Sequence, residues 1–450
     1  MTMPFSRQKV PALALALALA GLSSPPPSLA QAAGAFPLTH YRLRNGLNVI
    51  LSENPALPVV SVAVAYGAGS ILEPPGKTGM ASMMENLMFA GSANVPARQH
   101  FNYINRVGGT FNALVSEDRT VFYETVPSNR LSLLLWLESD RMRSLEFGPR
   151  DIEDARTALL EDLRDRRATD PFFESARRFD QLVYADFAQS HSLLGAEEDV
   201  RGLTLEDLRG FYGAYYGPNN AVLCIAGSFD KLKARELVSQ YFETLPRGRD
   251  TGPAAEPSLA LARKQVVESV VEPAAPAPAL YLGFRLPSPQ ANDFTTLTLL
   301  DYILFRGRSS RIVRRLLNPN AKIAVRLSGG IERRRDRAVY KIFVLANNDV
   351  MVEQCRAAIF AELDKLRSSL LSEDDLNRYK AMLKQDYLAR LSTSVDRALY
   401  LDDYFLTLGG FQEFGLDLEK YLSVTAADVV GIVARYLKPD NSIILDVRTK

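Results

Sequence analysis

"FYGAYYGPNNAVLCIAG" at residues 211–227 and "VARYLKPDNSIILDV" at residues 433–447 decide the fold of this chain. In both stretches an aromatic residue is followed by Pro, by Asn or Asp, by Asn, and then by an apolar run typical of a buried strand. Such similarity between the ends of two halves indicates internal duplication. The sequence therefore predicts two homologous domains of about 200 residues each.

The segments before each copy follow a similar order. Helical periodicity predicts helices over 78–91, 128–145, 149–168 and 171–189 in the first half and over 293–305, 350–367 and 372–391 in the second. Strand-like runs lie between them, which predicts an interleaved α+β fold. A segment rich in Pro, Gly and small residues separates the halves. We therefore expect a domain at 33–245, a linker at 246–265 and a second domain at 266–450.

The first 32 residues have the three parts of a secretory signal peptide. Arg7 and Lys9 precede the apolar run "VPALALALALAGL", and Ala30-x-Ala32 offers a cleavage site. The apolar run is shorter than the roughly 20 residues that span a bilayer, and no later stretch predicts a membrane span. We expect cleavage after Ala32 and a protein that is periplasmic or secreted.

Charge and cysteine usage narrow the class of protein further. The 53 Lys and Arg residues nearly balance the 52 Asp and Glu residues, which argues against nucleic acid as a partner. Cys224 and Cys355 lie in apolar segments, and buried free thiols are favoured over a disulfide. The basic stretch "ERRRDR" at 332–337 is interpreted as a solvated hairpin tip, with partner docking as the alternative.

One predicted helix carries an unusual polar group. In "GMASMMENLMFAGS" at 79–92, Ser82, Glu85 and Asn86 lie at spacings that share one helix face. An inverted zinc motif, His-x-x-Glu-His, has this geometry, with two imidazoles on the metal and the Glu acting on its water. Here both His positions hold other residues. A polar triple on a helix is also the ordinary composition of a solvated edge.

The chain resembles the insulinase/pitrilysin family of zinc metallopeptidases, which includes the mitochondrial processing peptidase. The matching segments are "NGLNVILSEN" (45–54), "GAGSILEPPGKTGMASMMENLMFAGS" (67–92), "INRVGGTFNALVSEDRTVFYETVP" (104–127), "LESDRM" (137–142), "LLEDLRDRRATDPF" (159–172) and "YYGPNNAVLCIAGSFD" (215–230). The second half resembles the family's catalytically silent repeat. The resemblance implies two homologous repeats, each a mainly antiparallel β-sheet packed by α-helices.

Carried over residue by residue, the resemblance assigns a degenerate zinc site to the first domain. Ser82 and Asn86 stand at the two His ligands, and Glu85 stands at the catalytic base. Asp162 stands at the third ligand, and an alternative register places Glu161 there. A hydroxyl and a carboxamide are poor zinc ligands, so we expect no metal or other cofactor and an idle Glu85. Zinc is expected only if a divergent site functions.

Peptide binding is expected to outlast the loss of the metal, because it uses the main chain. The segment with Phe111, Asn112 and Ala113 resembles the edge strand on which the family aligns substrates. An ordinary strand, with Gly108-Gly109 as its turn, is the alternative interpretation. Arg315 matches an Arg of the second repeat that contacts substrate in some family members.

Three functions follow from these residues. The first is an exported, inactive subunit that binds peptides and pairs with an active zinc-bearing homologue as a heterodimer, or with itself as a homodimer. The second is an active zinc metalloendopeptidase with a divergent site. The third is a non-enzymatic binding or structural protein of the cell envelope.

Overall fold

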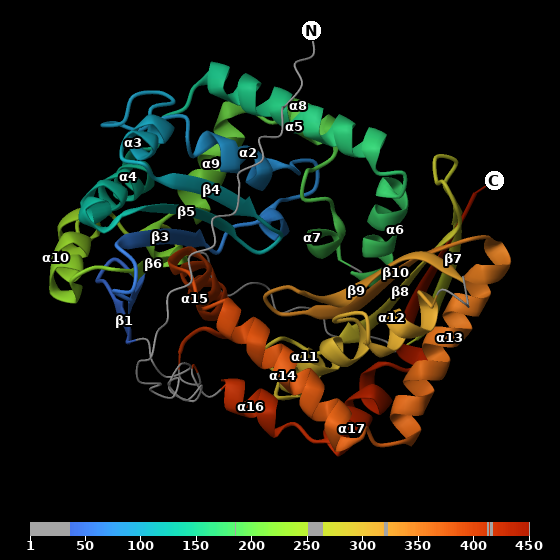
Figure 1. The fold of residues 1–450 in the computed structure, drawn as a ribbon. Helices are drawn as coiled ribbons and strands as arrows, with labels where there is room; N and C mark the ends of the chain where they lie inside the picture. Colours follow the sequence, from blue (N-terminus) through green and yellow to red (C-terminus); the bar gives the residue numbers. More distant parts are fainter. Residues whose placement is uncertain are drawn as a thin grey trace, which may run out of the picture.

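The structure is a computed structural model that describes residues 37–184, 186–250, 264–318, 323–411, 414 and 417–449 (Figure 1). The predicted signal peptide at 1–32 and most of the predicted linker, residues 251–263, lie outside the described residues.

The first half forms one sheet and its covering helices. Its elements are β1 (Leu38–Arg42), β2 (Asn48–Glu53), β3 (Val59–Tyr66), α2 (Met80–Leu87), α3 (His100–Arg106), β4 (Thr110–Val115), β5 (Thr120–Pro127), α4 (Leu131–Ser144), α5 (Pro149–Thr169), α6 (Phe173–Val183), α7 (Phe187–Ser190), α8 (Glu197–Gly202), α9 (Leu205–Tyr215), β6 (Ala221–Gly227) and α10 (Lys231–Phe242). The strand order is β1-β2-β6-β3-β5-β4.

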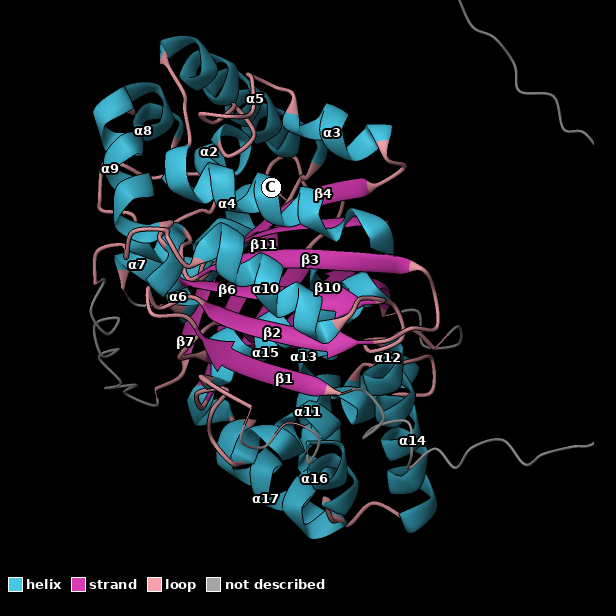
Figure 2. Ribbon diagram, turned by 90° about the vertical axis from the view of Figure 1, so that its left-hand side faces the viewer, coloured by secondary structure: helices cyan, strands magenta, loops and turns pink. Residues whose placement is uncertain are grey.

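The second half repeats this plan. Its elements are β7 (Val266–Val271), β8 (Ala279–Leu286), α11 (Asp293–Leu304), α12 (Arg311–Leu316), β9 (Ala324–Arg333), β10 (Ala338–Ala346), α13 (Asp349–Ser368), α14 (Glu373–Ala389), α15 (Ser394–Leu408), α16 (Asp417–Ser423), α17 (Ala426–Tyr436) and β11 (Ser442–Arg448). The strand order is β7-β11-β8-β10-β9. In Figure 2 the strands run through the middle, with helices of the first half above them and helices of the second half below.

The pairing within the sheets confirms the duplicated α+β fold. In each sheet one pair is parallel, β2 with β6 and β7 with β11, and the other pairs are antiparallel. The edge strand β4 of the first sheet therefore corresponds to β9 of the second. Each sheet encloses its own large apolar core with its helices.

The duplicated sequence stretches have one structural role in both halves. Asn220 donates from Nδ2 to the carbonyls of Tyr215 at 2.7 Å and Gly67 at 3.2 Å. Asn441 donates in the same way to Tyr436 at 2.6 Å and Arg285 at 2.8 Å. Each amide ties the end of a helix to the strand that follows it and to a neighbouring strand end. This shared task explains why the two copies keep the same Asn.

The two halves exchange one helix each. Helix α15 of the second half packs across β3 and β6 of the first sheet, where Ala398 and Leu401 join a buried cluster with Cys224. Helix α6 of the first half packs on β8 and β11 of the second sheet, where Phe179 stacks on Tyr281 with ring centroids 5.2 Å apart. Each half thus covers the face of the other half's sheet.

Three sequence-based expectations are tested at this level. The helix predicted over 171–189 is wrong as one element, because α6 ends at Val183 and α7 is a separate short turn. Cys224 and Cys355 are free and buried, as predicted. Within the ranges that the structure describes, none of the helices combines the length and apolarity needed to cross a bilayer.

The basic stretch at 332–337 is solvated only in part: Arg333 and Arg335 are exposed, as predicted, but Arg334 is not. Arg334 is only 4% exposed and lies between the halves. Its guanidinium contacts Gln189 Oε1 at 3.2 Å and Glu117 Oε1 at 3.3 Å, and it stacks 3.8 Å from the centroid of the Tyr184 ring. Acidic and aromatic groups of the first half satisfy this charge, so the β9–β10 turn is an interdomain contact.

Asp118 makes this contact dependent on pH. Its Oδ2 accepts the backbone N–H of Arg335 at 2.6 Å, and burial raises its pKa to about 6. The native state keeps this proton between about pH 4 and pH 6 while the unfolded chain loses it, so the free energy of unfolding falls as pH rises through that window. Asp118→Asn should remove this slope, which is worth at most about 3 kcal/mol at about 1.4 kcal/mol for each pKa unit. Urea unfolding of both chains from pH 4 to pH 7 measures it, and parallel stability curves would contradict the prediction.

Candidate functional site

Helix α2 is held at its start by a buried carboxylate. Gly79, with φ +93°, turns the chain into the helix. Glu73 accepts the backbone N–H of Gly79 at 2.8 Å and of Ala81 at 2.7 Å, so negative charge lies where the helix dipole is positive. His191 Nε2 lies 3.1 Å from the same carboxylate. The Glu73 carboxylate therefore fixes the start of α2, and His191 contacts that carboxylate.

The two replaced ligand positions lie on the same side of α2 but in different environments. Ser82 is buried, and its hydroxyl donates to the Leu193 carbonyl at 2.7 Å. Asn86 is exposed, and its Nδ2 lies 3.5 Å from the Ser82 carbonyl. Ser82 thus ties α2 to the segment after α7, and Asn86 is open to solvent.

Glu85 faces a carboxylate on the neighbouring helix. Helix α2 packs on α5, and burial together with the charge of Asp162 raises the pKa of Glu85. Asp162 is half-buried and accepts from Arg166 Nε at 3.1 Å. Glu161 is exposed on α5. Of the two candidate positions on α5, Asp162 is the one whose charge reaches Glu85.

These residues do not fit a zinc ion. The Ser82 hydroxyl is engaged with a carbonyl, the Asn86 amide is a weak zinc donor, and Asp162 is paired with an arginine. Catalytic zinc typically has three strong protein ligands, most often imidazoles or carboxylates. Only the carboxylate of Asp162 belongs to that class.

Ser82→Ala tests the structural role of this hydroxyl. The variant leaves the partly buried Leu193 carbonyl without its donor, so the free energy of unfolding should fall by about 1 kcal/mol. The zinc content of the purified chain should not change. Denaturant unfolding and metal analysis measure the two quantities, and a variant as stable as the parent would contradict the structural role.

The predicted substrate residues lie on one edge of the first sheet. Strand β4 packs beside α2 and contains Phe111, Asn112 and Ala113, and its outer side is paired with no other strand among the described residues. Asn112 is exposed and its Oδ1 accepts the backbone N–H of Ala113 at 2.9 Å. Arg315 is exposed on α12, whose main contacts are α11, α13 and β9 in the second half. The structure thus brings β4, but not Arg315, against α2.

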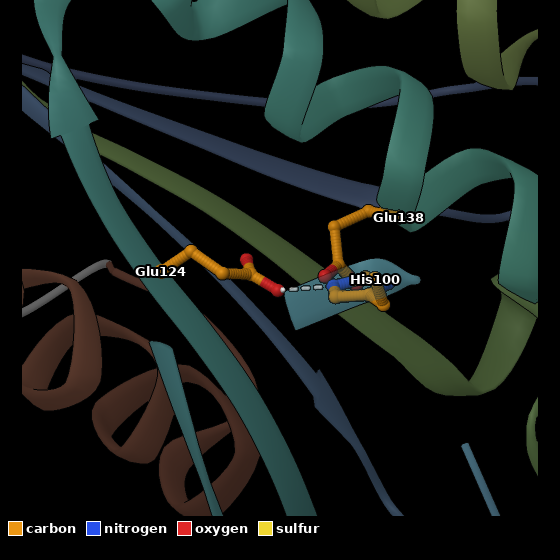
Figure 3. A group of neighbouring side chains, drawn as sticks. All are labelled: His100, Glu124 and Glu138. Carbon is orange, nitrogen blue, oxygen red and sulfur yellow. Dashed lines mark hydrogen bonds and ion pairs between the residues drawn. The ribbon is translucent and has the colours of Figure 1, made fainter. Parts of the chain in front are cut away.

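A buried charged cluster lies behind this surface (Figure 3). Among the described residues, His100, Glu124 and Glu138 form the only group of three His, Cys, Asp or Glu side chains with ligand atoms close enough for a metal. His100 Nε2 lies 3.3 Å from Glu124 Oε1, as the dashed line in Figure 3 marks. The Arg141 guanidinium contacts both carboxylates, with Nε 2.9 Å from Glu138 Oε2 and Nη2 3.2 Å from Glu124 Oε1.

This cluster is a structural ion network rather than a metal site. Arg141 already supplies the positive charge and lies 4.4 Å from the centroid of the Phe122 ring. Burial raises the pKa of both carboxyl groups, and burial together with Arg141 lowers the pKa of His100 to about 3, so the imidazole is neutral. Sequence reasoning missed the cluster. Its available signal was the acidic residues in the segments "YETVP" and "LESDRM".

Comparison with known proteins identifies the family of this chain. Residues 48–193 match the sequence profile described as "Insulinase (Peptidase family M16)", and residues 202–383 match "Peptidase M16 inactive domain". The chain is 27% identical over 408 residues to a Helicobacter pylori protein named "Zinc protease PqqE", and the match covers 89% of this chain and 90% of that protein.

Solved structures share the whole fold. A protease from Helicobacter pylori aligns with a TM-score of 0.86 at 25% identity, over 92% of this chain and 100% of that one. A "peptidase M16 inactive domain" from Pseudomonas fluorescens aligns with a TM-score of 0.80 at 16% identity, over 91% of this chain and 97% of that one. The two profiles between them span most of the chain, and this chain belongs to the insulinase family, peptidase family M16.

Proposed function

We propose that this protein is a catalytically inactive member of its family that binds peptides as a subunit of a zinc-dependent peptidase. The observation that carries the proposal is the set of residues at the ligand positions. The Ser82 hydroxyl donates to a carbonyl, and Asp162 is paired with Arg166. Without a metal, Glu85 has no activated water on which to act as a base.

The outer edge of β4 supports peptide binding. Ser116 donates its backbone N–H to Arg119 across the β4–β5 turn at 2.9 Å, so Asn112 and Leu114 also turn their N–H groups toward β5. By alternation, Phe111 and Ala113 turn theirs outward. An extended peptide can add to this edge as a further strand. In the free protein, the Asn112 side chain covers the Ala113 N–H.

Two substitutions on this edge test peptide binding. Ala113→Pro removes an outward N–H and should weaken binding of an extended peptide at least about tenfold, the effect of losing one or two backbone hydrogen bonds. Asn112→Ala uncovers the same N–H and should strengthen binding. Fluorescence anisotropy with a labelled unstructured peptide measures both. Equal affinity of the parent and the Pro variant would overturn the proposed edge.

The partner is proposed from the same incomplete site. A subunit that binds peptides but lacks the metal can contribute to peptide cleavage only beside a zinc-bearing homologue, which would make the assembly a heterodimer. The alternative is a homodimer of this chain. The export signal predicted at 1–32 supports a location of this assembly in the periplasm or outside the cell. Co-expression with a His-bearing homologue of the same organism should give a stable complex with altered peptide cleavage. Absence of both complex and effect would overturn the subunit role.

A second function, a divergent metalloendopeptidase, is favoured by one observation. The charge of Asp162 contributes to the raised pKa of Glu85, so two carboxylates lie close together at the position of the degenerate zinc site. Chelator-sensitive hydrolysis by the lone chain that Glu85→Gln abolishes would establish this function and exclude the inactive subunit.

A further inference from the structure

The second half contains a cavity where the first half has its candidate site. Helix α11 corresponds to α2, α14 to α5 and the edge strand β9 to β4, and α11 packs on α14 as α2 packs on α5. A cavity of about 150 Å³ is lined by residues of α11, β9, α14, α15 and α16. The duplicated architecture therefore leaves a partly open cavity at the position that is equivalent to the candidate site of the first half.

The walls of this cavity are aromatic. Four tyrosines line it, namely Tyr302, Tyr387, Tyr400 and Tyr421, and the hydroxyl of Tyr302 donates to Asp386 Oδ2 at 2.8 Å. Tyr387 and Tyr400 meet edge to face with centroids 5.9 Å apart. Burial raises the pKa of Tyr387 to about 12, so its hydroxyl is neutral and can donate a hydrogen bond. A volume near 150 Å³ admits a ring of the size of benzene.

The charge at the cavity is positive. Arg306 and Arg333 line it and are each paired with a carboxylate, Arg306 with Asp301 at 2.9 Å and Arg333 with Asp403 at 3.3 Å. Arg390 also lines it, is exposed, and has no ion-pair partner among the described residues.

The charge of Arg390 reaches Tyr302, Tyr400 and Tyr421 and lowers their pKa values, whereas burial raises them more strongly. The carboxylates of Asp386, at Tyr302, and of Asp417, at Tyr400 and Tyr421, also raise these pKa values. Three arginines and one carboxylate line the cavity, so Arg390 is the lining cation that is available to an anionic group.

Asp301 does not oppose an anion here, because both of its oxygens are engaged. Oδ1 accepts from the Tyr340 hydroxyl at 3.0 Å and Oδ2 from Arg306. A phosphate at neutral pH carries up to two charges and needs several donors, whereas a carboxylate needs one cation and one or two hydroxyl groups. The lining therefore favours a carboxylate attached to a ring.

We propose that this cavity binds an aromatic amino acid with a free α-carboxylate. Its ring would lie between the tyrosines, and its carboxylate would bind Arg390. A second cavity of about 110 Å³ shares Arg333, Tyr400 and Tyr421 with the first and gives room for a preceding residue. The C-terminal residue of a peptide and a free aromatic amino acid share this chemistry. The site is separate from the β4 edge, and its occupancy does not depend on the loss of zinc.

Titration calorimetry of the full chain with N-acetyl-L-phenylalanine tests the proposal. Saturable binding at one site is expected, with a dissociation constant on the order of 1 mM for a ligand of this size. N-acetyl-L-phenylalanine amide, which lacks the carboxylate, and acetate, which lacks the ring, should each bind at least about tenfold more weakly. Equal binding of the acid and the amide, or no saturable binding of the acid, would overturn the proposal.

Variants locate the site. Arg390→Gln should weaken binding of the acid at least about tenfold without changing its weak binding of the amide, and Arg390→Lys should restore part of the affinity. The matched control is Arg378→Gln, an exposed arginine on the same helix about 18 Å along its axis, paired with Asp375. Its affinity should equal that of the parent. An Arg390→Gln chain that binds as the parent does would place the ligand elsewhere and refute the assignment.

The affinities of free L-phenylalanine and of N-acetyl-glycyl-L-phenylalanine distinguish the two sources of the ligand. Tighter binding of the acetylated dipeptide supports a peptide C-terminus that also occupies the second cavity. Tighter binding of the free amino acid supports the same carboxylate chemistry with a metabolite as its source. Inorganic phosphate that displaces either probe at lower concentration would contradict both.

Discussion

Replacing Ser82, Asn86 and Asp162 by His, His and Glu is expected to give a chain that binds one equivalent of zinc. The parent offers one carboxylate of ordinary zinc-binding strength at these positions, and that carboxylate is paired with Arg166. Two neutral imidazoles and a longer carboxylate complete a three-ligand site. Affinity should rise by at least roughly 1000-fold, or about 4 kcal/mol. Metal analysis after dialysis against weak chelator measures it.

The single variants and Glu85 provide controls for this experiment. Asn86→His alone leaves the Ser82 position without a strong ligand and Asp162 paired with Arg166, and should not retain zinc. Adding Glu85→Gln to the triple variant should leave zinc binding intact, because Glu85 stands at the base position and not at a ligand position. One equivalent of zinc on the unaltered chain, or none on the triple variant, would show that the ligand assignment is wrong.

Arg141→Met is expected to have the largest effect on stability. Arg141 and Glu138 are fully buried, and the guanidinium is the only cation in contact with Glu138 and Glu124 among the described residues. Removing one partner of a buried ion pair leaves uncompensated charge and costs about 3–5 kcal/mol. Denaturant unfolding at pH 8 should show this loss.

The pH dependence of Arg141→Met follows from the same carboxyl groups. Burial raises both of their pKa values above the unfolded value, so the native variant holds protons that the unfolded chain releases. Its stability therefore falls as pH rises above about 4.5, and the deficit should be smaller at pH 5 than at pH 8. The double variant Glu138→Gln/Arg141→Met removes both charges and should recover part of the loss. An equal deficit at both pH values would contradict the buried network.

The local elements of this fold were predictable because their signals are local. The helix predicted over 78–91 contains α2, and the Asn of each duplicated stretch has the same hydrogen bonds in both halves. Apolar periodicity and turn residues determine such features within a few residues of chain.

The contacts between distant segments were not predictable from these patterns. The periodicity of α6 and α15 does not indicate which sheet the apolar face of each helix covers. Arg334 lies in a stretch whose composition is typical of a solvated turn, although its side chain is buried. The ion network depends on His100, Glu124 and Glu138 meeting from three separate elements. Pairings of this kind come from tertiary packing, and a single sequence records only the residues that take part.

The exchange of α6 and α15 decides where this protein can open. A hinge between the halves would pull α15 from β3 and β6 and α6 from β8 and β11, exposing apolar faces on both sheets at about 25 cal/mol for each Å². We therefore expect the two halves to move together as one rigid body. In the proposed subunit role, a long peptide on the β4 edge would therefore be enclosed by a second polypeptide and not by a hinge between these two halves.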